Sequence, residues 1–144
     1  MAIEPLPNKT RNMEKVIVNV DWEDNYGAWI ESLPGCVAVA HTYDALKKDI
    51  AKSIEMHLAA MRKDGDEIPA EFNDEYTLVF KMNARAILHH YNGIFTQAGL
   101  ARITGINQRQ IGHYATGHSV PREIQRVKII NGIRHLLEEF ETVV

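Results

Sequence analysis

The sequence has almost no cysteine. Its single cysteine, Cys36, has no partner in the chain for a disulfide and cannot supply the several thiolates of a structural zinc site. His89 and His90 are adjacent, and a helix would point adjacent side chains in different directions, so the two cannot chelate one metal ion together. We therefore predict no disulfide within the chain, no metal site and no cofactor.

Long hydrophobic runs are also missing. No stretch of about eighteen apolar residues occurs. The N-terminus, with Glu4, Pro5 and Pro7, lacks the apolar segment of a signal peptide. With 45% hydrophobic residues in 144, the chain has enough apolar side chains to fold as one ordinary domain or two small ones. These features predict a soluble cytoplasmic protein.

Acidic side chains are absent between Lys81 and Arg122. Residues 1–80 hold fifteen acidic and eight basic side chains, whereas residues 81–144 hold four acidic and eight basic ones. The formal net charge of -3 therefore combines an acidic first part with a basic second part. A basic stretch without acids suits a surface that faces phosphates, and the alternative is a chance clustering of charge. Its basic residues are Lys81, Arg85, Arg102, Arg109 and Arg122.

Residues 16–40 have the alternation that is typical of β-strands. Val16, Val18 and Val20 would share one face of a first strand. A turn is predicted at residues 25–27, a second strand at residues 28–31, and a short apolar third strand at residues 36–40.

A helix and a further strand follow in the first part of the chain. Thr42 is a good N-cap, and apolar residues then recur every three or four positions until Gly65. After a polar loop with Pro69, residues 76–82 alternate again as a fourth strand. This order, βββαβ, predicts a domain of residues 1–82 with one helix on a single face of a small sheet. The apolar helix positions are Leu46, Ile50, Ile54, Leu58 and Met61.

Beyond Met82 the apolar period is helical to the end, so residues 83–144 are predicted to form an all-α domain and the whole chain an α+β protein. The last stretch carries one apolar stripe, interrupted by Gly132, which could bend or divide the helix. The stripe is expected to pack on the other helices or to form a dimer contact. Its members are Ile124, Val127, Ile130, Ile133, Leu137 and Phe140.

Residues 97–116 fit a helix-turn-helix. Two helices that meet at a steep angle need a small residue where they approach most closely and a turn residue that tolerates a left-handed backbone. Ala101 and Gly105 meet these needs. Four further apolar side chains have the spacing to be buried between the helices, namely Leu100, Ile106, Ile111 and Tyr114.

The second helix, at about residues 107–115, turns polar side chains away from that core. Arg can donate two hydrogen bonds to guanine, and Gln or Asn can pair with adenine, so this face suits a DNA major groove. Gly112 would allow a close approach of the backbone, and His118 is a further candidate for a phosphate contact. The alternative is a solvated helix face. The predicted DNA-binding residues are Thr96, Gln97, Asn107, Gln108, Arg109, Gly112, His113, Thr116 and Arg122.

Two stretches of the sequence resemble known families. Residues 95–122 resemble the Xre/Cro-type helix-turn-helix through Thr96-Gln97-Ala98-Gly99-Leu100-Ala101, Gly105-Ile106-Asn107-Gln108, and Tyr114 through Gly117 to Pro121. The first part resembles the HicB antitoxin domain through Gly27-Ala28-Trp29, Leu33-Pro34-Gly35-Cys36, and Thr42 with Ala45 before a long helix. His41 departs from that pattern, and residues 1–12 match neither family.

The resemblance implies a type II antitoxin. Its N-terminal domain would be a partial ribonuclease-H-like sheet that binds and neutralises a HicA-type toxin, which cleaves mRNA, and its C-terminal domain would bind operator DNA and repress the shared operon. The acidic first part suits a basic partner. The toxin-binding residues stay open, because the exposed acids could be solvated only. A homodimer or a higher even-numbered oligomer is expected, since repressors commonly span two half-sites.

Two other functions are alternatives to this one. Catalysis by the sheet domain would need carboxylates converging on metal ions, and Asp21, Asp44 and Asp49 are poorly spaced for this, so no enzyme activity is predicted. A stand-alone transcriptional repressor, whose first domain dimerises or senses a ligand, stays open as the alternative.

Overall fold

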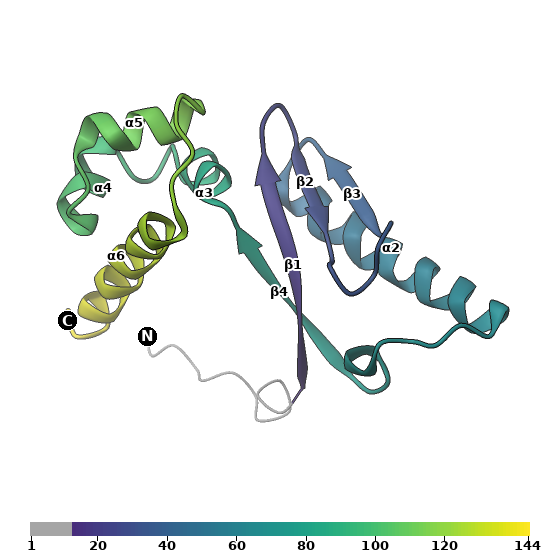
Figure 1. Cartoon of the computed structure of the whole chain (residues 1–144). Coiled ribbons are helices and arrows are strands. Elements are labelled where there is room, and N and C mark those ends of the chain that lie inside the picture. Colours follow the sequence, from purple (N-terminus) through teal and green to yellow (C-terminus); the bar gives the residue numbers. More distant parts are fainter. Residues whose placement is uncertain (1–12) are drawn as a thin grey trace. The chain divides into compact units, whose positions relative to one another are not determined.

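The computed structural model describes residues 13–144, an α+β chain (Figure 1). It divides into two compact units. The sheet unit contains Asp24–Lys81 and the described residues up to Val20, and the helical unit contains Met82–Val144 together with Asp21–Glu23. The sequence did not indicate that these three residues belong with the helices. The interpretation of Glu4, Pro5 and Pro7 lies outside the described residues.

The sheet has four strands in the order β3-β2-β1-β4. They are β1 (Glu14–Trp22), β2 (Tyr26–Trp29), β3 (Val37–Ala40) and β4 (Tyr76–Met82). β2 and β3 are antiparallel, whereas β4 runs in the same direction as β1 (Figure 1). Val16, Val18 and Val20 are at most 1% exposed, which confirms the predicted inward face of the first strand.

Two strand boundaries differ from the prediction. The turn lies at residues 23–25, and β2 begins at Tyr26 because this side chain is buried, 4% exposed, with its ring 6.0 Å from the ring of Tyr43. β3 begins at Val37, because the Cys36 N–H donates to the Leu33 carbonyl (3.0 Å) and so closes a turn instead of pairing with β2.

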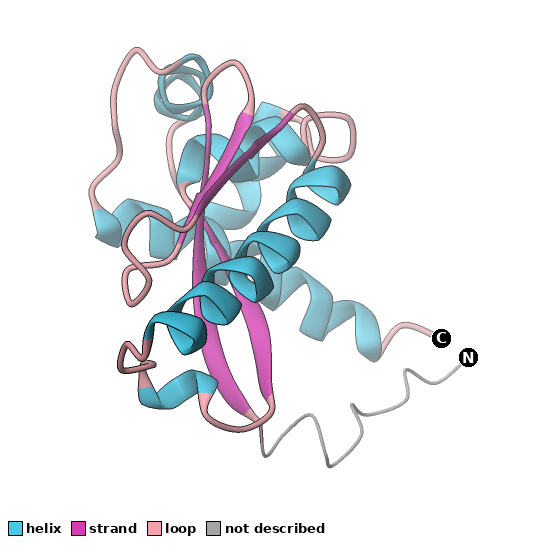
Figure 2. Cartoon of the chain, turned by 90° about the vertical axis from the view of Figure 1, so that its right-hand side faces the viewer, coloured by secondary structure: helices cyan, strands magenta, loops and turns pink. Residues whose placement is uncertain are grey.

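Helix α2 (Tyr43–Asp64) lies across one face of the sheet (Figure 2). It begins as predicted, because the Thr42 hydroxyl accepts from the Ala45 N–H, and it ends at Gly65 with φ of 73°. Leu46, Ile50, Ile54 and Leu58 are at most 1% exposed. The loop that follows is less polar than predicted, since it holds the short helix η1 (Ala70–Phe72) with a buried Phe72.

The helical unit contains α3 (Ala84–His90), α4 (Gln97–Thr104), α5 (Gln108–Thr116) and α6 (Glu123–Glu141). Asn83 caps α3 by accepting from the Ala86 N–H at 2.8 Å. Within residues 13–144, no helix combines the length and the apolar character needed to cross a membrane.

The apolar stripe of α6 packs on the other helices only in part, and the alternative, a dimer contact, stays a prediction. Ile124, Leu137 and Phe140 are 67%, 59% and 68% exposed, because the helix turns Ile129 and Gly132 inward instead. Gly132 neither ends nor divides α6. A Cβ at Gly132 would lie 2.7 Å from the Ile103 carbonyl oxygen, so this glycine lets the backbones of α6 and α4 approach each other.

Candidate nucleic-acid interface

The α4–turn–α5 segment has the predicted bounds and the predicted core. Leu100, Ile106, Ile111 and Tyr114 are at most 5% exposed, so all four predicted core residues are buried. Gly105 follows α4 with φ of 74° and donates its N–H to the Ala101 carbonyl at 3.0 Å. This left-handed residue lets the chain turn sharply into α5.

A hydroxyl stabilises the same turn. Thr104 Oγ1 donates to the Leu100 carbonyl (2.6 Å) and accepts from the Ile106 N–H (3.1 Å). Thr104 thus makes hydrogen bonds to the residues before and after Gly105, and these bonds stabilise the angle between α4 and α5.

The surface of α5 opposite its core is polar. At about 100° per residue, this surface covers roughly 140° of the helix circumference, opposite Ile111 and Tyr114. The guanidinium of Arg109 is exposed and has no hydrogen bond or ion pair to any residue that the structure describes. The surface is formed by Gln108, Arg109, Gly112, His113 and Thr116.

Two of the predicted DNA-binding residues are engaged in the helix itself. Asn107 is the N-cap of α5, and its side-chain oxygen accepts from the Arg109 N–H at 2.9 Å. This bond fixes the orientation of the Asn107 side chain and uses one of the two lone pairs of its oxygen. The Thr116 hydroxyl donates to the Gly112 carbonyl at 3.1 Å.

Gln97 and Gly112 lie against each other. A Cβ at Gly112 would be 3.1 Å from Oε1 of Gln97, so the first residue of α4 uses the space that the missing side chain leaves on α5. Thr96 caps α4 by accepting from the Gly99 N–H at 2.9 Å. The N-terminus of α4 and the polar surface of α5 thus form one continuous surface, with backbone N–H groups at its edge.

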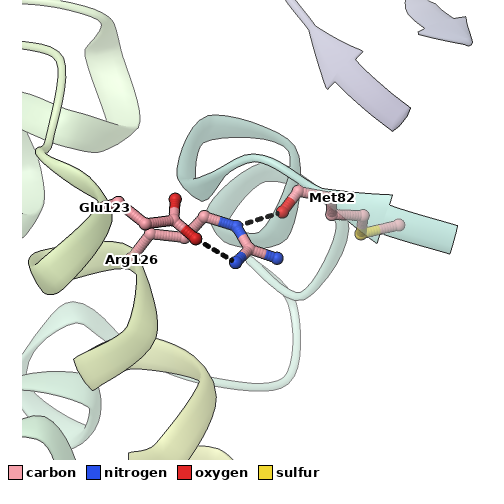
Figure 3. A network of polar contacts seen from close by, with 3 residues as sticks. All are labelled: Met82, Glu123 and Arg126. Atoms are coloured by element: carbon pink, nitrogen blue, oxygen red, sulfur yellow. Dashed lines mark hydrogen bonds and ion pairs between the residues drawn. The ribbon is translucent and has the colours of Figure 1, made fainter. Parts of the chain in front are cut away.

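His118 and Arg122 lie beyond the end of α5, and both are exposed. The His118 ring is 4.6 Å from the His113 ring, and Arg122 is the N-cap residue of α6. Glu123 is the acid nearest to Arg122 in sequence, and it pairs with Arg126 at 3.1 Å, which offsets its charge (Figure 3). Arg126 also donates to the Met82 carbonyl at 2.8 Å and so ties α6 to the start of the helical unit.

Arg85 belongs to the predicted basic stretch, but it is used inside the helical unit. Its guanidinium lies over the Trp22 ring (5.4 Å), and a Cβ at Gly117 would be only 2.9 Å from its Cζ. The Trp22 ring also stacks on the His89 ring at 3.7 Å. This cluster was not predicted, because nothing in the local sequence relates Trp22 to a helix that begins 62 positions later.

Burial lowers the pKa of His89, with a smaller contribution from the neighbouring His90. Among residues 13–144, no three histidine, cysteine, aspartate or glutamate side chains are grouped so that they could hold a metal ion.

No family model matches this chain, and no curated protein matches it.

Proposed function

We propose that this protein binds DNA through α4 and α5 and acts as a transcriptional repressor. The observation that carries the proposal is the burial of Leu100, Ile106, Ile111 and Tyr114, which presents Gln108 and Arg109 at the exposed N-terminal end of α5. In helix-turn-helix proteins, the N-terminal residues of the second helix contact base edges.

The chemistry of the surface supports reading of the major groove. Arg109 can donate two parallel hydrogen bonds to guanine, and Gln108 can pair with adenine. Thr96, Gln97 and Arg122 lie at helix N-termini, where backbone N–H groups and cationic side chains bind phosphate. The absence of acidic residues from Lys81 to Arg122 favours the same partner.

Three single substitutions test this proposal. The DNA is the duplex upstream of the chain's own gene, compared with an unrelated duplex over a series of salt concentrations. Arg109→Ala is expected to weaken specific binding by about 1–3 kcal/mol and unrelated binding far less. Arg122→Ala should weaken both and lower the salt slope by about one.

Arg102→Ala is the matched control, because Arg102 is an exposed arginine on α4 that lines a groove with Gly132 and His135 of α6. It should leave binding nearly unchanged. Equal losses for Arg109→Ala and Arg102→Ala would contradict a base-reading role of α5.

We further propose that the sheet unit binds and neutralises a basic toxin that cleaves mRNA, as the resemblance to HicB antitoxins implies. The specific observation in favour is charge: residues 1–80 hold nearly twice as many acidic as basic side chains. Several of the acids are exposed in the structure, and opposite charge speeds and orients association. The exposed candidates in the sheet unit include Asp24, Glu31, Asp66 and Glu67.

A growth assay tests the antitoxin proposal with the full chain. A small open reading frame found next to this gene is induced alone, with the wild-type chain, and with Arg109→Ala. We expect arrest that both chains relieve, because neutralisation is assigned to the sheet unit and DNA binding to α5. The absence of arrest, or arrest that the wild type does not relieve, would favour the stand-alone repressor.

A further inference from the structure

The two edges of the sheet differ in how they are protected from other strands. β4, on one edge, has Lys81 near its end and Glu75 just before its start. β3, on the other edge, has neither charge nor proline between Cys36 and Ala40. Charged side chains and proline are the usual protection of an edge strand. The β3 edge lacks this protection.

The side chains of β3 alternate between two environments. Val37 and Val39 are 58% and 67% exposed, whereas Ala38 and Ala40 are partly covered on the side of α2. Ser53 of α2 donates to the Val37 carbonyl at 3.4 Å, so the helix lies directly over the start of the strand. The edge therefore combines an unprotected backbone with exposed valines.

We propose that the β3 edge is an interface with a second copy of this chain, in which the two β3 strands pair antiparallel about a two-fold axis at Ala38. This register sets Val37 opposite Val39 of the second copy and Ala38 opposite itself. Side chains directly opposite each other in an antiparallel pair lie on the same face. Val37 and Val39 of both copies then form one patch on one face of a continuous sheet, and the two α2 helices cover the other face.

The residues that flank β3 fit this register. With the axis at Ala38, His41 lies opposite Gly35 of the second copy, which has no side chain to oppose it. If the axis instead lay between two residues, an exposed valine would lie opposite a covered alanine. The α2 helices of the two copies would then lie on opposite faces of the joined sheet. The strand is thus self-complementary in this register.

Charge does not oppose the pairing, although the sheet unit is acidic. Its acids are concentrated from the end of α2 to the start of β4, at Asp64, Asp66, Glu67, Glu71, Asp74 and Glu75. Residues Val37–Ala40 are uncharged, so no like charges meet between the two paired strands. The acidic segment stays available for a basic partner, and the two surfaces are independent.

The flank of α2 beside β3 would complete the interface. A four-residue strand alone falls short of the ~800 Å² per partner that a stable interface commonly buries. Ser53 identifies the flank that faces β3, and Met56 and Ala60, three and seven positions further on, lie near it on the helix. Met56 is 65% exposed. Asp49, four positions before Ser53, is exposed on the same flank, so this second layer combines the apolar Met56 and Ala60 with one carboxylate.

The first test measures the mass of the assembly that the full chain forms in solution, by sedimentation equilibrium at high micromolar concentration. Val39→Lys adds a charge at the edge, and Ile17→Lys, on the exposed side of the central strand β1, is the matched control with 52% exposure. We expect Val39→Lys to halve the mass of the assembly and Ile17→Lys to leave it unchanged. A monomeric wild type, or an equal effect of both variants, would overturn the proposal.

The second test examines the register. Chains with Val37→Cys and chains with Val39→Cys are oxidised mildly, separately and as a mixture, with the wild type as a control for the buried Cys36. Pairing about Ala38 predicts a covalent dimer in the mixture only. A dimer of Val39→Cys with itself would instead place the axis at Val39, and no dimer in any sample would overturn the pairing of β3 edges. Neither readout involves DNA or a toxin, so the proposal is tested separately from the proposed function.

Discussion

The sheet unit and the helical unit are held together in different ways. In the sheet unit, large aliphatic side chains of α2 and β1 form the core, and Ile50, Ile54 and Val18 are fully buried. In the helical unit, glycines bring other atoms into close contact. Gly132 lies against the Ile103 carbonyl, and Gly117 lies against the guanidinium of Arg85.

This difference explains why sequence patterns predicted the core between α2 and the sheet but not the approach of α6 to α4. Interlocking side chains produce a periodic apolar pattern that is visible in the sequence. A close approach at glycine produces no such pattern, since the informative feature is a missing side chain. The two units should therefore respond to different substitutions, and the two tryptophans allow each to be observed separately. Trp29 lies in the sheet unit and Trp22 in the helical unit, so Trp22→Phe leaves a reporter of the former and Trp29→Phe a reporter of the latter.

The largest effect is expected for Ile54→Ala in the sheet unit. The side chain is fully buried under the sheet, so its removal should lower the free energy of unfolding by about 2–5 kcal/mol through lost apolar burial and a cavity. Urea unfolding followed by Trp29 fluorescence, in the Trp22→Phe background, measures it. Ile17→Ala, at an exposed position, is the control and should have much less effect. An equal loss of unfolding free energy in the two variants would contradict the burial of Ile54 in the core of the sheet unit.

A smaller loss, about 1–3 kcal/mol, is expected for Gly132→Ala in the helical unit. The added methyl group would meet the Ile103 carbonyl oxygen at 2.7 Å, so α6 must move away from α4. The measurement is urea unfolding followed by Trp22 fluorescence in the Trp29→Phe background. Gly93→Ala is the matched control, because a Cβ there would meet no atom within 4 Å. Stabilisation by Gly132→Ala, as expected at an open helix position, would show that the backbones are not in contact.

Alkaline pH should weaken the sheet unit modestly. Tyr76 donates to Glu55 at 2.8 Å, and burial, with this bond, raises the pKa of Tyr76 to about 12. Between pH 10 and 12 the unfolded chain loses a proton that the folded chain keeps, so the free energy of unfolding falls as pH rises. Tyr76→Phe should flatten this dependence, as reported by Trp29. An unchanged alkaline slope in Tyr76→Phe would assign the effect to other groups.

Acid should weaken the helical unit, and this is the smallest of the four effects. Because burial lowers the pKa of His89, the folded chain binds fewer protons than the unfolded chain just below pH 6.5. The free energy of unfolding should fall slightly as pH drops through that value. His89→Phe keeps a ring against Trp22 and should remove the dependence, measured by Trp22 fluorescence during urea unfolding. A slope that survives this substitution would contradict the assignment to His89.

The sequence predicted those elements that local chemistry determines. Thr42 and Gly65 bound α2 because a hydroxyl cap and a left-handed glycine act within a few residues. Gly105 and the four buried residues around it predicted α4 and α5 for the same reason. The polar surface of α5 followed from that core, because the residues opposite a buried face are exposed.

Elements that depend on distant partners were predicted less well. Tyr26 belongs to β2 because its ring packs beside the ring of Tyr43 on α2. The local sequence Asn25-Tyr26-Gly27 does not indicate this partner. The inward face of α6 is set by its approach to Ile103, so the more apolar stripe, with Ile124 and Phe140, is exposed instead.

The contact between Gln97 and Gly112 has a consequence for protein engineering. A Cβ at position 112 would lie 3.1 Å from the amide oxygen of Gln97, so a larger residue there requires this exposed, flexible side chain to shift. The side chains that fit at position 112 therefore depend on the residue at position 97. A library that retargets α5 to a new binding sequence gains by diversifying positions 97 and 112 together.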